Sequence, residues 1–210
     1  AAEINALRRE ALSRLADRLK ERAPYRINES NIIIQNRKPN KKPQTYILFR
    51  DTAAIPEDVK CDKLFIPLFS KPELFKKYSA GAVLPRGIFG NFDEIVERLI
   101  KSGAKYALCN TLDSVAAAKK AGVRIIGGPF LNIFNSVSLS EIQKLGAAEC
   151  VLSYEMTLKQ LSALEGECRR GICVYGRVPL MLTRNCPIKN GKSCRECGGM
   201  SSLRDRKGIE

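Results

Sequence analysis

A regular alternation of short apolar runs with helical segments constrains the fold of this chain more than any other feature. The apolar runs cover residues 45–49, 63–68, 82–85, 106–110, 123–128, 150–153 and 171–176. They start roughly every 18 to 25 residues, which is the period of a β/α unit and not of an antiparallel sandwich. The runs are almost continuously apolar, as strands covered on both faces should be. We therefore predict an α/β fold of parallel strands, a TIM-like β/α barrel that is complete or distorted, with a doubly wound open sheet as the alternative.

The segment before this alternation has the pattern of one amphipathic helix over residues 3–22. Its apolar side chains recur at steps of three and four, and Pro24 ends it. We predict three parts: an N-terminal helix in residues 1–30, a β/α barrel-like domain in residues 31–183 and a cysteine-rich cluster or metal segment in residues 184–210. The first residue is not Met, so we expect a processed chain or a fragment of a longer protein, similar to its C-terminal half.

Charge and composition narrow the function. The chain has 36 Lys and Arg against 22 Asp and Glu, a net charge of +14, which favours RNA as a partner over an inert basic surface. It has no His, which removes Ser-His-Asp and Cys-His catalysis and histidine metal ligands. No apolar run approaches the ~20 residues that span a bilayer, so no membrane contact is expected. Eight cysteines without a secretory signal favour reduced thiols or bound metal, and therefore a cytoplasmic location.

Polar residues follow several of the predicted strands, where parallel α/β folds place their active sites. The candidates for substrate binding are Asn110, Asn132, Asn135, Ser153 and Arg177. Glu155 and Arg177 are the candidate catalytic residues, because a charge that faces a cavity needs a partner and Arg suits a carboxylate or phosphate. An exposed Arg177 would remove this argument. The alternative is that the Asn and Ser residues cap helices or form turns.

Three cysteines near the end of the chain form the sharper motif. Cys194 and Cys197 make a CxxC pair, and Cys186 precedes them by eight residues. Thiolates this close repel one another unless a cation neutralises them, so we expect zinc or an iron–sulfur cluster at Cys186, Cys194 and Cys197. A redox pair is the alternative, and no other cysteine has the spacing of a fourth ligand.

Five short motifs from residue 124 onward resemble peptidase family U thirty-two, the collagenase-like proteases. They are "GPFLNIFNS", "VLSYEMTLKQL", "CVYGRVPLM", "NCPIKNGKSCRECGG" and "LRDRKG". The resemblance implies a TIM-barrel-like fold and an iron–sulfur cluster with four cysteine ligands, of which Cys186, Cys194 and Cys197 match three. In the family a further cysteine follows the "DRKG" segment, so the cluster is expected in the full-length protein and its fourth ligand is absent from this chain.

The resemblance also implies two activities. Bacterial members hydroxylate a pyrimidine of tRNA or ribosomal RNA, with the carboxylate metabolite prephenate implicated, and the positive charge and absence of His favour this activity. The family label indicates instead a peptidase, in which Glu155 or a metal activates water to cleave a protein substrate. A third hypothesis is a non-catalytic substrate-binding part with zinc or nothing on the cysteines.

Overall fold

A computed structural model of the chain describes residues 2–21, 42–179, 181–183, 186, 195 and 206–207. The chain divides into two compact units, residues 1–33 and residues 34–210. Most of the cysteine-rich segment predicted for residues 184–210 lies outside the described residues.

The first unit contains one helix, α1 (Ala2–Lys20), which confirms the predicted N-terminal helix. Glu3 in its first turn and Arg18 and Lys20 in its last turn complement the helix dipole. None of its residues is buried, and its apolar side chains are exposed, among them Ile4 at 71% and Leu19 at 77%.

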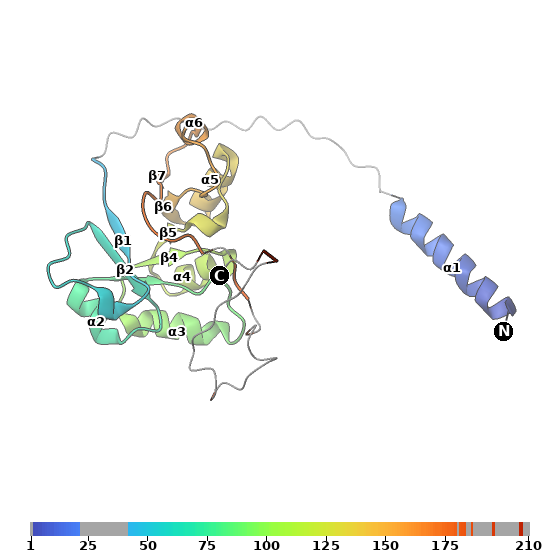
Figure 1. Ribbon diagram of the computed structural model, residues 1–210, viewed down its shortest axis with the longest axis horizontal. Helices are drawn as coiled ribbons and strands as arrows, with labels where there is room; N and C mark the ends of the chain where they lie inside the picture. Colours follow the sequence, from blue (N-terminus) through green and yellow to red (C-terminus); the bar gives the residue numbers. More distant parts are fainter. Residues whose placement is uncertain are drawn as a thin grey trace. The chain divides into compact units, whose positions relative to one another are not determined.

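The second unit alternates strands with helices (Figure 1). The strands are β1 (Tyr46–Leu48), β2 (Lys63–Pro67), β3 (Gly81–Val83), β4 (Tyr106–Cys109), β5 (Arg124–Gly127), β6 (Ala147–Val151) and β7 (Arg169–Gly171). The α-helices are α2 (Pro72–Tyr78), α3 (Phe92–Ser102), α4 (Leu112–Lys120), α5 (Ser136–Lys144) and α6 (Leu158–Ala163). Two short 3-10 helices are η1 (Thr52–Ala54) and η2 (Pro129–Leu131).

The strands form one sheet in the order β1-β2-β3-β4-β5-β6-β7, and every neighbouring pair is parallel. A doubly wound sheet reverses its strand order at a switch point, so the sequential order excludes that alternative. Within residues 42–179 no pairing joins β7 to β1, and the sheet curls into an open half-barrel. The prediction of parallel β/α units is confirmed, and the barrel is not a closed one. None of the helices in the described part of the chain is long and apolar enough to cross a membrane.

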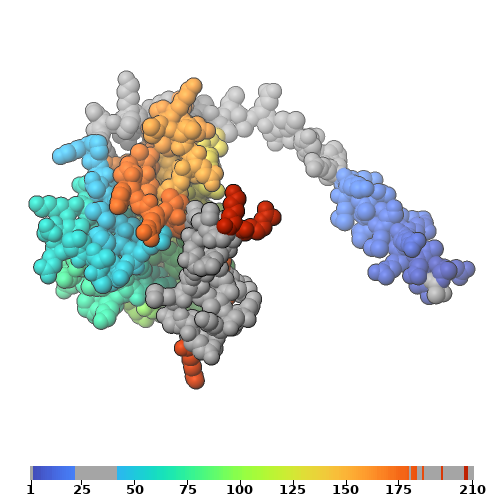
Figure 2. Space-filling view, in the orientation of Figure 1, coloured from blue at the N-terminus to red at the C-terminus, as the bar shows by residue number. Residues whose placement is uncertain are grey.

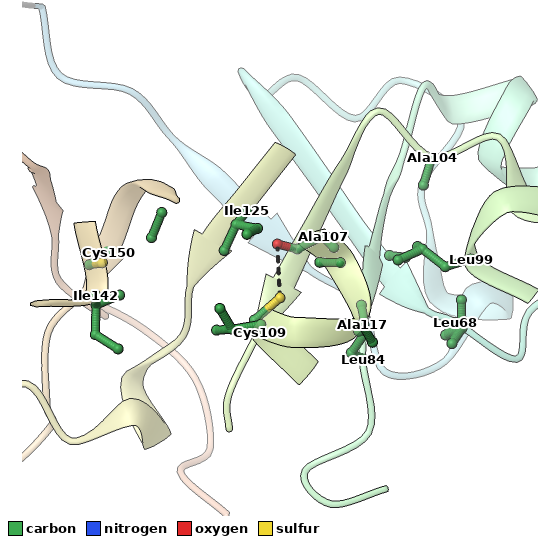
Figure 3. Close-up of a cluster of buried hydrophobic side chains, with 14 of the residues drawn as sticks. Leu68, Leu84, Leu99, Ala104, Ala107, Cys109, Ala117, Ile125, Ile142 and Cys150 are labelled. Atoms are coloured by element: carbon green, nitrogen blue, oxygen red, sulfur yellow. Dashed lines mark hydrogen bonds between the residues drawn. The ribbon is translucent and has the colours of Figure 1, made fainter. Parts of the chain in front are cut away.

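The helices pack on one face of the sheet, where most of the apolar core lies. Alternate strand residues, such as Ile66, Ala107 and Ile125, point into this core and meet Leu99 of α3 and Leu139 of α5. Figure 3 shows part of this cluster, with Ala107 and Cys109 of β4 drawn between Ile125 of β5 and Leu99 of α3. The Cys109 thiol donates to the Ala107 carbonyl and to the Ser114 carbonyl, so this buried cysteine is a packed core residue.

The opposite, concave face has a smaller apolar cluster and a charged layer. Phe65, Leu108 and Ile126 are buried there, with Tyr46 and Tyr106 packed against them. The Phe65 ring meets the Tyr106 ring at 5.3 Å between centroids, nearly edge to face. These residues alternate along their strands with the helix-facing ones, as the two-residue period of a strand requires.

Glu149 of β6 is the centre of the charged layer. Glu149 is 5% exposed, and its carboxylate accepts hydrogen bonds from Lys63 Nζ at 2.7 and 2.8 Å and from Arg124 Nη2 at 2.8 Å. The Tyr46 hydroxyl donates to it as well. The carboxylate therefore connects β1, β2, β5 and β6 across the concave face.

The pKa values agree with this arrangement. Burial alone would raise the pKa of Glu149, but the hydrogen bonds from Lys63 and Tyr46 and the charges of Lys63 and Arg124 outweigh it and lower that pKa. Burial and the bond to Glu149 raise the pKa of Tyr46, which keeps the phenol protonated as a donor.

A second link joins the two ends of the sheet. Arg169 of β7 donates to the Gln44 side chain at 2.5 Å and to the Lys42 carbonyl at 2.8 Å, both in the segment that leads into β1. Figure 2 shows this blue segment and the orange end of the sheet side by side. Hydrogen bonds from a side chain, and not a strand ladder, therefore connect the two ends of the open half-barrel.

A bulge in β6 determines which face Glu149 occupies. Ile125 pairs with Ala147, whereas the next residue, Ile126, pairs with Glu149, so Ala148 is left over. Because one extra residue inverts the alternation of a strand, Glu149 turns to the concave side beside Ile126 while Ala147 and Cys150 face the helices.

The seventh strand exists, but it lies mostly before the segment that was predicted to form it. The apolar run 171–176 was expected to be the strand, but β7 is Arg169–Gly171, and the run that follows is exposed, with Val174 at 84% and Tyr175 at 95%. The charged segment Arg169–Gly171 forms the strand in place of the apolar run because both arginines have partners there: Arg169 donates to the Gln44 side chain, and Arg170 donates to the Leu164 carbonyl. Cys173 is consequently exposed and not a buried strand thiol. The helix α2 was not predicted.

We predict that Glu149→Gln lowers the free energy of unfolding by about 3 kcal/mol at pH 7, because Lys63 is left as a buried unpaired charge. Glu97→Gln, which breaks the exposed pair with Lys101, is the control and should cost about 0.5 kcal/mol or less. Urea denaturation of the 210-residue chain measures both.

The pH dependence gives a second readout. The folded-state pKa of Glu149 lies below its ordinary value of 4.5, so its stabilisation is complete above that pH and is lost as the pH falls through the folded-state pKa. The difference between wild type and Glu149→Gln should therefore shrink on acidification. Equal stability of the two proteins at pH 7 would show that Glu149 does not hold the sheet.

Candidate functional site

The carboxyl ends of all seven strands lie at the same edge of the sheet, because the strands are parallel. We call this the carboxyl edge: the residues that directly follow each strand. Ligand sites of parallel α/β proteins form there. Five of the predicted site residues follow β4, β5 or β6 at this edge: Asn110, Asn132, Asn135, Ser153 and Glu155.

Asn110 is the most informative of them. It follows β4, is 5% exposed, and its Oδ1 has no hydrogen-bond partner among the described residues. It does not cap α4, since Thr111 takes that position and forms a capping box with Ser114. A buried polar atom without a partner costs roughly 1–3 kcal/mol. Folding alone does not account for this unpartnered oxygen, which is fully enclosed by the protein and would meet a ligand only if the Asn110 side chain turned toward the edge.

Gly128 leaves room for the Asn110 amide because it has no side chain. It follows β5 next to Asn110, and a Cβ added to Gly128 would lie 2.1 Å from Asn110 Oδ1 and 2.7 Å from its Cγ. Its backbone, with φ −92° and ψ 166°, is one that any residue can adopt. The side chain of Asn110, and not the backbone conformation, is what requires glycine here.

The other predicted polar residues separate into two groups. Ser153 is buried, and its hydroxyl donates to Asn132 Oδ1 at 3.4 Å, so these two side chains meet at the edge. Asn132 has φ +55° after η2, a turn conformation that Asn tolerates. Asn135 accepts from Ser138 N at 2.8 Å and is the N-cap of α5, which accounts for it without a ligand.

The two predicted catalytic residues are exposed. Glu155 lies near Ser153, whose hydroxyl accepts from the Glu155 backbone N–H at 3.4 Å. Arg177 lies beyond β7, directly after the exposed segment 171–176 that the sequence had assigned to a strand. Its exposure removes the argument that a buried charge needs a partner. The structure thus groups Asn110 with Gly128 and Ser153 with Asn132 and Glu155, but it provides no contact between Arg177 and these residues.

Sequence reasoning missed a cationic and aromatic group at the same edge. The Arg86 guanidinium, after β3, lies 4.6 Å from the centroid of the Phe130 ring, and Phe130 meets Tyr154 edge to face at 5.6 Å. Phe130 belongs to η2 after β5 and Tyr154 follows β6. The rule that selected Asn110 and Ser153 also applies to these residues, since Arg86 follows "AVLP" and Phe130 follows "RIIGGP".

Electrostatics add Arg50 and Cys173 to this group. Burial and the neighbouring Cys173 thiol raise the pKa of Tyr154, whereas the positive charges of Arg50 and Arg86 oppose this rise. Neither arginine makes a hydrogen bond or ion pair with another residue of the described part of the chain. Two arginines without carboxylate partners near one phenol form a site that suits an anion.

The proposed metal ligands are only partly described. Cys186 is an exposed free thiol, and Cys194 and Cys197 lie outside the described residues. The described residues include no group of three or more His, Cys, Asp or Glu side chains that could hold a metal ion. Cys150 and Cys168 lie 3.6 Å apart between their sulfurs, buried among apolar side chains on the helix side of the sheet.

Comparison with known proteins gives no further assignment. No protein-family model matches the chain, and no curated protein or solved structure matches it either.

We predict that Gly128→Ala destabilises the protein by about 1 to 3 kcal/mol, because the new methyl group collides with the Asn110 amide. Gly90→Ala is the matched control, since a Cβ there meets nothing within 4 Å. In the double variant Asn110→Ala/Gly128→Ala the loss should be largely reversed. Chemical denaturation of the wild type, the single variants and the double variant measures these free energies of unfolding. A double variant that is as unstable as Gly128→Ala would refute the close contact between Gly128 and Asn110.

Proposed function

We propose that this chain provides the substrate-binding half-barrel of a protein that hydroxylates a pyrimidine of tRNA or ribosomal RNA. The observation that carries the proposal is the carboxyl edge, where Arg50 and Arg86 lack carboxylate partners and the buried Asn110 amide lacks a hydrogen-bond partner. The motifs that resemble peptidase family U thirty-two and the net charge of +14 support it as well.

Each polar or charged group at the carboxyl edge would contact a different part of the substrate. If its side chain turns toward the edge, the Asn110 amide can donate to and accept from a base, which would satisfy its Oδ1. Arg50 and Arg86 would pair with phosphate or with the carboxylate of a small metabolite such as prephenate. Ser153 and Asn132 add a hydroxyl and an amide at the same edge. Glu155, whose backbone N–H donates to Ser153, is the remaining candidate for a contact with the reacting groups, whereas no contact in the described part of the chain supports Arg177.

The cofactor belongs to the same proposal. Cys186, Cys194 and Cys197 would hold an iron–sulfur cluster together with a further cysteine of the full-length protein, and such a cluster supplies electron transfer. Zinc at the same thiols would fit a structural role instead. Elemental analysis of the full-length protein, purified without oxygen, distinguishes iron from zinc.

The charge of the chain is unevenly distributed. Residues 42–179 contain 19 Lys and Arg against 14 Asp and Glu, so most of the excess of +14 lies in residues 1–41 and 180–210. General attraction to RNA is therefore a property of the flanking segments. The half-barrel itself would contribute specific contacts.

We predict opposite effects of Asn110→Ala on stability and on activity. Because the substitution removes an unpartnered buried oxygen, stability should be unchanged or higher, whereas hydroxylation should fall at least about tenfold. The measurement is mass spectrometry of RNA nucleosides from cells that lack the gene and carry wild type or the variant. The product is a pyrimidine that is one oxygen heavier.

Lys76→Ala in the last turn of α2, at the other edge of the sheet, is the control and should leave the product at its wild-type level. Cells that lack the gene and still contain every hydroxylated pyrimidine would exclude the proposed function. An Asn110→Ala protein with full activity would exclude the role of the amide.

A further inference from the structure

Two aromatic rings of the carboxyl edge, Phe130 and Phe69, are each stacked with an arginine, in one case from the edge itself and in the other from helix α3. Arg86 lies over Phe130 at 4.6 Å, and Arg98 of α3 lies over Phe69, which follows β2, at 4.8 Å. Phe69 is 55% exposed and Tyr154 is 37% exposed. Large aromatic side chains that stay this accessible and are paired with guanidinium groups offer surfaces on which further planar groups can stack.

The sheet order determines how these groups are arranged. Arg50, Phe69, Arg86, Phe130 and Tyr154 follow β1, β2, β3, β5 and β6, so they succeed one another along the edge in chain order. Neighbouring strands lie about 4.8 Å apart, so β2 and β5 are separated by about 14 Å along the sheet. This length exceeds a small metabolite and fits a polymer with repeated rings and repeated negative charges.

We propose that the carboxyl edge binds an unpaired, single-stranded segment of RNA. Its bases stack on Phe69, on Tyr154 and on the Arg86–Phe130 pair, its phosphates pair with Arg50 and Arg86, and the Asn110 amide contacts the edge of one base. This inference rests on the proposed RNA function and specifies its substrate.

The need for an unpaired strand follows from the kind of contact. In a double helix both faces of each base are covered by neighbouring bases, so protein rings can stack only on bases of loops and single strands. Proteins usually bind single-stranded nucleic acids on surfaces where aromatic side chains alternate with positively charged ones. A duplex would contact only the arginines, as phosphate partners.

The test is fluorescence anisotropy of the 210-residue chain with a labelled 12-nucleotide oligouridylate and with a 12-base-pair RNA duplex. Phe69→Ala and Phe130→Leu, which keeps apolar volume but removes the ring, should each weaken single-strand binding about tenfold. Neither ring variant should change the slope of log affinity against log salt. Arg50→Gln and Arg86→Gln should each reduce that slope by about 0.7.

Lys76→Gln, a cation at the opposite edge, is the control and should change neither affinity nor slope. Circular dichroism and thermal unfolding confirm that each variant is folded. Wild-type affinity in all four edge variants would overturn the inference and place RNA binding in the flanking segments. Equal affinity for single strand and duplex would overturn it as well, as would displacement of the oligonucleotide by millimolar malonate at constant ionic strength.

The outcomes also separate this inference from the proposed function. Ring-dependent binding of single strands without any hydroxylated nucleoside supports the RNA site and refutes hydroxylation. Hydroxylation that persists in Phe69→Ala and Phe130→Leu with unchanged affinity refutes the stacking site alone.

Discussion

The half-barrel depends on the carboxylate of Glu149. A closed barrel keeps its curvature by pairing its last strand with its first, but β7 and β1 are not paired in the described part of this chain. Instead, Glu149 accepts hydrogen bonds from Tyr46, Lys63 and Arg124 across the concave face. Because three donors converge on one buried acceptor, the carboxylate keeps its charge and the strands keep their spacing. Arg169 completes the link between the two ends of the sheet.

The stabilising contacts and the proposed binding groups lie at opposite edges of the sheet. Tyr46, Lys63 and Arg124 begin their strands, whereas Asn110, Arg86 and Arg50 follow theirs. In β/α proteins the amino ends of the strands serve stability and the carboxyl ends serve ligands. The charged residues agree with this division, since Lys63 and Arg124 have a carboxylate partner and Arg50 and Arg86 have none among the described residues.

The sequence was sufficient for the repeating units and insufficient for their contacts. The apolar runs and their spacing predicted six of the strands and their alternation with helices, because strands that are buried on both faces require nearly continuous apolar residues. The same rule misplaced the seventh strand, since Arg169 is held by a polar layer that no local pattern reveals. The position of Asn110 followed from the strand-end rule, but its unpartnered oxygen depends on Gly128, which belongs to another strand. Glu149 could not have been selected, because its partners lie far away in sequence.

The bulge at Ala148 has a wider consequence than its size indicates. Strand side chains alternate between two environments, so whether one residue is paired or left out of the pairing determines the environment of every residue that follows it. If Ala148 were instead paired in a regular ladder, Glu149 would enter the apolar layer beneath the helices, and Cys150 would occupy the polar layer in its place. Ser153 would lose its position beside Asn132 by the same shift. The pairing of a single strand therefore positions both the Glu149 carboxylate, which links four strands, and the polar groups at the proposed binding edge.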